Sequence, residues 1–165
     1  MVRFGLALFL AAAALPTAAA PAITSCFTPG QDGTGLIVDT IGAAERQIRV
    51  QAYSFTSAPI AKALADAYRR GVDVQVILDK SQIHRRDLSA KRRRARGDRL
   101  QVAIAHNKVM VIDGATVITG SFNFTKAAQD KNAENLLVLH DAELARQYLT
   151  NWESRLAVSK PYKRE

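Results

Sequence analysis

Two strand-like segments on either side of a helix-like segment restrict the fold of this chain more than any other feature. Residues 48–53 alternate apolar and polar side chains, which predicts a strand with one buried face. Residues 72–78 are rich in valine and end at Asp79, as in a buried strand. Between them, Ser57 can cap a helix that ends before Gly71. This succession predicts a parallel strand pair joined by a right-handed crossover.

The rest of the chain adds strands and helices around this unit. We expect a helix at about 34–45, strands at 101–112, 116–119 and 136–139, and a last helix after Asp141 with Trp152 in the core. Asp113-Gly114 is a hairpin turn signal. Residues 23–33 are expected to form an N-terminal arm. The predicted fold is α/β, with a mixed central β-sheet flanked by helices in one domain over 23–160 and a polar tail at 161–165.

The first 22 residues have the features of a secretory signal peptide. Arg3 precedes an apolar run at 4–15, and small alanines follow at 18–20. The run is too short for a stable transmembrane helix. We therefore expect a periplasmic or secreted protein with no stable membrane insertion after cleavage; an uncleaved membrane anchor is the alternative. Cys26, the single cysteine, excludes an intrachain disulfide and leaves a free thiol or a bond between chains.

The charge of the chain points to a polyanionic partner. The formal net charge is +8, which favours nucleic acid, anionic lipid or acidic glycans. Residues 84–99 hold much of the positive charge, and Arg92, Arg93 and Arg94 are its centre. This segment is expected to be a solvated loop or a phosphate-binding surface, and the two are compatible.

The side chains that suit chemistry begin at His106 and Lys108. One residue separates them on a predicted strand, so both side chains are expected on one face. A neutral imidazole is a nucleophile, and a neighbouring ammonium can hold a phosphate oxygen. Asp113 has the opposite parity, so a structural or orienting role is favoured over direct participation.

A second pair of polar residues, Ser121 and Asn123, follows directly after Gly120. Both can face one side and donate hydrogen bonds to phosphate oxygens. Glu134 is a candidate to orient a histidine and to stabilise its charged form. Asp79, at the end of a strand, is assigned a capping role because no cluster of metal ligands accompanies it; no metal or cofactor site is predicted.

The motifs, and the order in which they follow one another along the chain, resemble the signature of the phospholipase D superfamily. The matching residues are His106-x-Lys108 with Asp113, Gly120-Ser121-Phe122-Asn123, and Glu134-Asn135. The run from Gly120 to Thr125 is most similar to the small bacterial endonuclease branch. The likeness extends from about Phe27 to Arg155.

The resemblance implies a phospholipase D-like fold and a metal-independent mechanism. In the family, a motif histidine attacks phosphorus to form a phosphohistidine, and a second motif histidine protonates the leaving oxygen and then activates water. Carried over, His106 is nucleophile or acid, Lys108 and Asn123 bind phosphate, and Ser121 and Glu134 support the histidine. Arg92, Arg93 and Arg94 are expected to bind the substrate backbone.

The chain contains only one His-x-Lys sequence, although double displacement needs two histidines. His84 and His140 lack that spacing and are expected to be exposed loop residues. The second catalytic histidine must then come from another chain, and a two-fold homodimer sharing one active site supplies it.

Three functions are therefore compared. The first is an endonuclease on DNA, with RNA left open as a further substrate. The second is a lipid phosphodiesterase with the same chemistry. The third is a catalytically impaired nucleic-acid-binding protein, because the stretch between Asp79 and His106 looks shorter than in the family and is rich in arginine.

Overall fold

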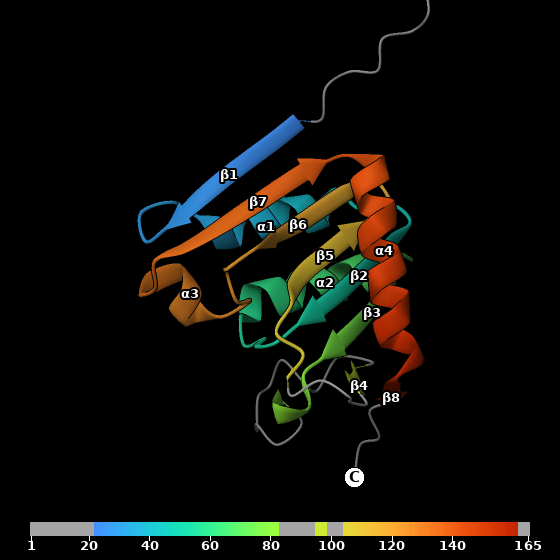
Figure 1. The fold of residues 1–165 in the computed structure, drawn as a ribbon. Coiled ribbons are helices and arrows are strands. Elements are labelled where there is room, and N and C mark those ends of the chain that lie inside the picture. The colour runs from blue at the N-terminus through green and yellow to red at the C-terminus, as the bar shows by residue number, and fades with distance from the viewer. Residues whose placement is uncertain (1–21, 83–94, 99–103, 162–165) are drawn as a thin grey trace, which may run out of the picture.

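The computed structural model describes residues 22–82, 95–98 and 104–161. These residues form one eight-stranded mixed sheet with the strand order β1-β7-β6-β5-β2-β3-β4-β8. The expected α/β class, with helices flanking a mixed sheet, is confirmed (Figure 1). In chain order the elements are β1 (Ala22–Thr28), α1 (Gly33–Gly42), β2 (Gln47–Ala52), α2 (Ala58–Arg69), β3 (Asp73–Leu78), the 3-10 helix η1 (Lys80–Gln82), β4 (Ala95–Asp98), β5 (Lys108–Ile112), β6 (Thr116–Gly120), α3 (Lys126–Asp130), β7 (Glu134–His140), α4 (Ala142–Ala157) and β8 (Ser159–Pro161).

Strands β2 and β3 are the parallel pair that the sequence predicts, and α2 connects them. The other edge of β2 pairs with β5 in the antiparallel direction, with Ala52 opposite Lys108. This register places Tyr53, the residue after β2, beside the segment that leads into β5. The site described below is built at this junction.

Helices cover both faces of the sheet (Figure 1). Helices α1 and α2 pack on one face and bury the larger apolar cluster, which includes Ile37, Ile60 and Val50. Helix α4 packs on the other face, where Trp152 is buried as expected and its indole N–H donates to Val50 O at 2.9 Å. None of the helices in the described ranges combines the length and the apolar character that crossing a bilayer requires.

The expected N-terminal arm is instead an edge strand. Residues Ala22–Thr28 form β1, which pairs in the antiparallel direction with β7. Its inward residues include Cys26, while the larger Ile23 and Phe27 are 60% and 58% exposed. Burial raises the pKa of the Cys26 thiol, and the charge of Asp32 adds to this effect. Cys26 is thus a core residue, and its thiol could form a disulfide with another chain only if this part of the core became exposed.

Part of the arginine-rich segment also differs from the loop expectation. Ala95–Asp98 form β4, which pairs with β3 in the parallel direction and with β8 in the antiparallel direction. Strand β8 includes Pro161, the first residue of the expected polar tail. The expected signal peptide up to residue 21 and the predicted substrate-binding residues Arg92, Arg93 and Arg94 lie outside the described residues.

The hairpin between β5 and β6 has the predicted turn. Asp113 and Gly114 both adopt positive φ, 54° and 70°, as such tight turns require. The Asp113 carboxylate accepts hydrogen bonds from the backbone N–H groups of Glu45, Arg46 and Gln47 at 2.8–2.9 Å. Asp113 therefore fixes the start of β2. It lies at one end of β5 and His106 lies at the other, so the role of Asp113 is structural.

The electrostatics of Asp113 give this role a pH dependence. Burial alone would raise the pKa of its carboxyl, but the three backbone N–H donors and the Arg46 guanidinium outweigh burial and lower the pKa. A group with a lowered folded-state pKa stabilises the fold above its unfolded pKa, which is about 4 for aspartate. That stabilisation is lost as the pH falls through the lower folded-state value.

We expect Asp113→Asn to lower the free energy of unfolding at pH 7 by about 1–2 kcal/mol, because an amide cannot accept all three hydrogen bonds. Denaturant unfolding at several pH values measures this loss, which should shrink as the pH falls below about 4. The control is Asp39→Asn, since Asp39 is exposed on α1. Equal stability of the two variants at pH 7 would contradict the role given to Asp113.

Candidate functional site

The segment that carries His106 is held by hydrogen bonds from two neighbouring strands. It precedes β5, so the prediction that His106 lies within a strand is wrong; β5 begins at Lys108. Tyr53 N–H, at the end of β2, donates to Asn107 O at 2.9 Å, and the Gln51 amide donates to the Asn107 side chain at 3.0 Å. These bonds fix the residue between His106 and Lys108 and thereby direct both side chains.

Asp79 holds the same segment from the end of β3. One carboxylate oxygen accepts from Ala105 N–H at 2.7 Å, and the other accepts from Ser81 N–H at 2.9 Å. The expected capping role of Asp79 is confirmed in this form. Burial alone would raise the pKa of this carboxyl, but the hydrogen bonds from Ala105 and Ser81 keep the pKa below its ordinary value. The ionised carboxylate thus ties the end of β3 to the residue before His106.

Lys108 makes the central contact of the site. Its ammonium lies 2.9 Å from His106 Nδ1, 3.1 Å from Nε2, and 2.7 Å from the His106 carbonyl oxygen, to which it donates. Only 8% of Lys108 is exposed. Burial lowers the pKa of Lys108, and the negative charge of Glu134 opposes that shift. An ammonium only donates, and which ring nitrogen accepts from it depends on the tautomer of His106.

Tyr53 supports this pair from the side. Its ring centroid lies 4.5 Å from that of His106, with the planes tilted by 49°. The Lys108 ammonium lies 5.3 Å from the Tyr53 ring centroid, within the range of a cation–π contact. Tyr53 therefore limits the positions of both side chains.

The backbone after β6 places the next two site residues. Gly120 has φ of 147°, and a Cβ atom there would lie 2.2 Å from Asn135 O. Only glycine fits this close approach, which lets Ser121 N–H donate to Asn135 O at 3.0 Å. The chain then turns so that Ser121 and Asn123 border the space in front of His106.

Glu134 is held in a defined orientation by its neighbours. Ser121 Oγ donates to Glu134 Oε2 at 2.6 Å, and the Asn132 amide donates to Oε1 at 3.0 Å. In turn, Asn135 N–H donates to Ser121 Oγ at 3.0 Å. Among the described residues, Glu134 is thus bonded to Ser121 and Asn132, and its predicted contact with a histidine is not made with His106 of the same chain.

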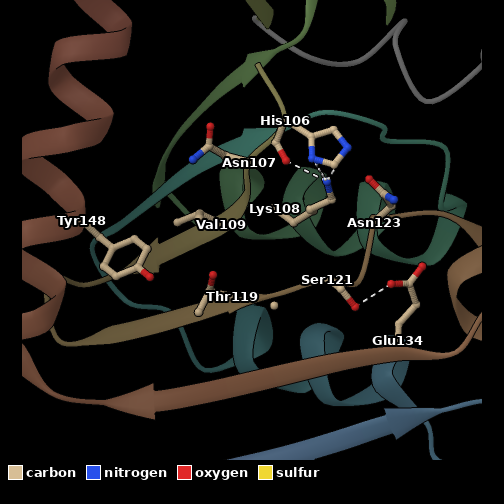
Figure 2. Close-up of a pocket in the computed structure, with 10 residues that line it drawn as sticks. His106, Asn107, Lys108, Val109, Thr119, Ser121, Asn123, Glu134 and Tyr148 are labelled. Atoms are coloured by element: carbon tan, nitrogen blue, oxygen red, sulfur yellow. Dashed lines mark hydrogen bonds between the residues drawn. The ribbon is translucent and has the colours of Figure 1, made fainter. Parts of the chain in front are cut away.

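These side chains line one solvent-open pocket of about 560 Å³. Figure 2 shows His106 and Lys108 on one side of it, Asn123 beside them, and the Ser121–Glu134 pair opposite. Asn123 Oδ1 is buried and has no hydrogen-bond partner within the part of the chain that the structure describes. The other lining residues are Asn107, Val109, Thr119, Gly120 and Tyr148. The pocket therefore combines one imidazole, one ammonium, one carboxylate and several uncharged donors, which suits a phosphate group.

Of the six residues that the sequence analysis assigns to the catalytic site, five line this pocket and Asp113 does not. The five are His106, Lys108, Ser121, Asn123 and Glu134. His140 ends β7, where its Nδ1 lies 3.0 Å from Thr116 Oγ1, and it does not line the pocket. Within the described ranges, no group of three or more His, Cys, Asp or Glu side chains is arranged to hold a metal ion. The sequence analysis did not predict Asn107 and Tyr148 as lining residues, because neither belongs to a motif that indicates a catalytic or binding role.

Comparison with protein families agrees with this geometry. Residues 37–156 match the family described as cardiolipin synthase, PLD-like domain. The chain belongs to the phospholipase D superfamily. The motif resemblance seen in the sequence is thereby confirmed, and a phosphodiesterase type of enzyme follows from it.

The chain is also similar in sequence or structure to individual proteins. "Phospholipase D" of Rickettsia bellii is 44% identical over 141 residues, which are 82% of this chain and 69% of that protein. "Mitochondrial cardiolipin hydrolase" of Xenopus laevis is 31% identical over 135 residues, 78% of this chain and 64% of that protein. The crystal structure of Nuc from Salmonella typhimurium, a phospholipase D family member, superposes with a TM-score of 0.81 at 36% identity, covering 88% of this chain and all of that one.

We expect Asp79→Asn to lower kcat for a small phosphodiester about tenfold with little change in KM, because its amide group would face Ala105 or Ser81 N–H and displace His106. The measurement is the hydrolysis of bis(p-nitrophenyl) phosphate. Asp73→Asn is the control, since Asp73 lies at the opposite end of β3, where its exposed carboxylate pairs with Arg49. If both variants had the same kcat, Asp79 would not position His106.

Proposed function

We propose that this protein is a metal-independent endonuclease that hydrolyses DNA through a phosphohistidine intermediate. The observation that carries the proposal is the single pocket in which His106, Lys108 and Asn123 face one another. The net charge of +8 and the resemblance of the Gly120–Thr125 run to small bacterial endonucleases favour nucleic acid as the substrate. Phosphate-directed contacts predict little sequence preference.

In the proposed reaction, an unprotonated ring nitrogen of His106 attacks the scissile phosphorus. A nitrogen–phosphorus bond forms while the bond from phosphorus to the leaving oxygen breaks. A second imidazole, protonated at the start, gives its proton to the leaving oxygen. That imidazole then takes a proton from water, and the water oxygen attacks phosphorus and releases His106. The Lys108 ammonium and the Asn123 amide donate hydrogen bonds to the non-bridging oxygens throughout.

The second imidazole is proposed to come from another copy of the chain. His106 is the one histidine among the described residues that line the pocket. The Glu134 carboxylate faces the pocket from the side opposite His106 (Figure 2), where it can orient a partner's histidine. A two-fold axis through the pocket would place two equivalent rings on opposite sides of one phosphorus.

An uncovered apolar surface beside the pocket supports the dimer. Strand register aligns Phe27 with Asn135, and Ile23 with Leu139, Val117 and Val111 across the sheet. These aligned residues share the face on which α4 packs against Val111 and Val117. Phe27 and Ile23 lie beyond α4 on that face and are exposed. A second copy on this face would bury them next to the shared site.

Two other functions remain as alternatives. A lipid phosphodiesterase would use the same pocket, and the names of the Rickettsia and Xenopus relatives refer to lipid substrates. A nucleic-acid-binding protein without turnover would use the positive charge alone. We further propose that residues 1–22 direct the protein to the periplasm or the exterior, on the basis of their composition.

The proposal predicts that the protein nicks supercoiled plasmid DNA in EDTA, and that His106→Ala lowers the rate about a thousandfold or more. His140→Ala is the matched control, since His140 lies outside the pocket, and it should nick normally. Phosphatidylcholine vesicles are incubated in parallel.

Each alternative has its own result in this assay. Headgroup release without nicking would replace the nuclease by a lipid phosphodiesterase. Salt-sensitive DNA retention without any turnover would indicate a binding protein. Nicking that EDTA abolishes would contradict the metal-independent mechanism.

A further inference from the structure

A second groove adjoins the phosphate pocket. It has a volume of about 570 Å³ and shares Asn123 with the first pocket. Tyr53, whose ring contacts His106, also lines it. The two hollows therefore meet at the residue proposed to hold the scissile phosphate, and a ligand longer than one phosphate can extend from one into the other. Its lining residues are Tyr53, Ser54, Thr56, Ser81, Asn123, Thr125, Lys126 and Ala127.

The base of this groove is fixed by contacts between two loops. Phe55, after β2, forms a parallel bridge with Phe124, after β6, and their buried rings meet edge to face at 5.7 Å. The N–H groups of Thr56 and Ser57 both donate to Phe124 O at 2.9 Å. The two walls are thus joined beneath the groove, so its shape exists before any ligand binds.

Most of the side chains that line the groove carry a polar group. Of the eight described residues around the groove, four carry an aliphatic hydroxyl, one an amide and one an ammonium. Among these eight described residues, Ala127 supplies the only aliphatic side chain without a polar group. A sugar–phosphate would find hydrogen-bond donors and acceptors along this groove, and the carbon atoms between them can contact the sugar and the base.

We propose that this groove binds the nucleotide unit next to the scissile phosphate, so that a nucleic-acid strand lies across Asn123. The proposal rests on the proposed nuclease function and specifies its substrate as a strand rather than a lipid. Lys126 is the contact for the neighbouring phosphate, because it carries the one charge among the described residues that line the groove.

Lys126 is free to make such a contact. Its side chain is 87% exposed and pairs with Asp130 one turn later in α3. An exposed pair of this kind contributes little to stability, so a phosphate can replace the carboxylate. Lys62 on α2 has the same arrangement: it is 74% exposed, pairs with Asp66 one turn later, and lines neither hollow. It is the matched control.

The experiment measures binding of a fluorescein-labelled twelve-residue oligothymidylate by anisotropy in EDTA. Lys126→Gln and Lys62→Gln are each made in a His106→Ala background, which prevents cleavage. We expect Lys126→Gln to raise Kd about fivefold and to reduce the slope of log Kd against log salt by about 0.7, the loss of one phosphate contact. Lys62→Gln should change neither quantity.

A second measurement separates the groove from the catalytic pocket. In chains that keep His106, Lys126→Gln should lower kcat/KM for the oligonucleotide and leave hydrolysis of bis(p-nitrophenyl) phosphate unchanged, since that diester has no neighbouring nucleotide. Equal strand binding by the two lysine variants would overturn the proposal. So would a Lys126 effect on the small diester, or on phosphatidylcholine vesicles in place of the strand.

Failure of the proposed function has a different signature. If strand binding depends on Lys126 but wild-type protein nicks no DNA, the groove stands as a strand-binding site and the nuclease function is wrong. If wild-type protein nicks DNA and Lys126→Gln nicks and binds as Lys62→Gln does, the function stands and the groove proposal is wrong.

Discussion

The contact between the buried Lys108 ammonium and His106 is the interaction on which the site depends. A charge that is 8% exposed must be satisfied by hydrogen bonds, and Lys108 finds acceptors in the His106 ring and its carbonyl oxygen. This requirement fixes the position of the ring beside the ammonium. Tyr53 closes one side of the pair, and the open side faces the pocket. A negatively charged phosphate entering there would gain the ammonium as a partner without rearrangement of the pocket walls.

The pocket is assembled at the meeting point of chain segments that are distant in sequence. Asp79 at the end of β3 holds Ala105, and the residues at the end of β2 hold Asn107, so His106 lies between two anchored neighbours. On the other side, the close approach at Gly120 aligns the turn after β6 with the start of β7, where Glu134 begins. The mixed sheet is what allows this, because antiparallel β5 begins where parallel β2 and β3 end.

Much of this arrangement could be predicted from the sequence, and each miss has a physical reason. The β2–α2–β3 unit and the hairpin at Asp113 follow from periodicity and turn chemistry, and both are confirmed. Strand β1 was missed because its large apolar residues do not face the core. Cys26 is buried, while Phe27 and Ile23 are exposed. Helix α3 is too short to show a period.

His106 was placed within a strand because the pattern of apolar residues continues through it, whereas the bond from Ala105 to Asp79 takes the chain away from the sheet. The capping role of Asp79 follows from its place at the end of a strand, whereas its bond to the residue before His106, and the place of Lys126 in the groove, are recognised only from the fold.

In the proposed mechanism, one phosphate is handled by two copies of His106, one from each of two chains. Rapid mixing with excess bis(p-nitrophenyl) phosphate, followed by an alkaline quench and mass spectrometry of the peptide that contains His106, measures the claim directly. We expect a p-nitrophenylphosphoryl adduct on His106 that saturates at about one half per chain, because a shared site admits one nucleophile at a time. An adduct that approaches one per chain, or its absence from His106 while substrate is hydrolysed, would contradict it.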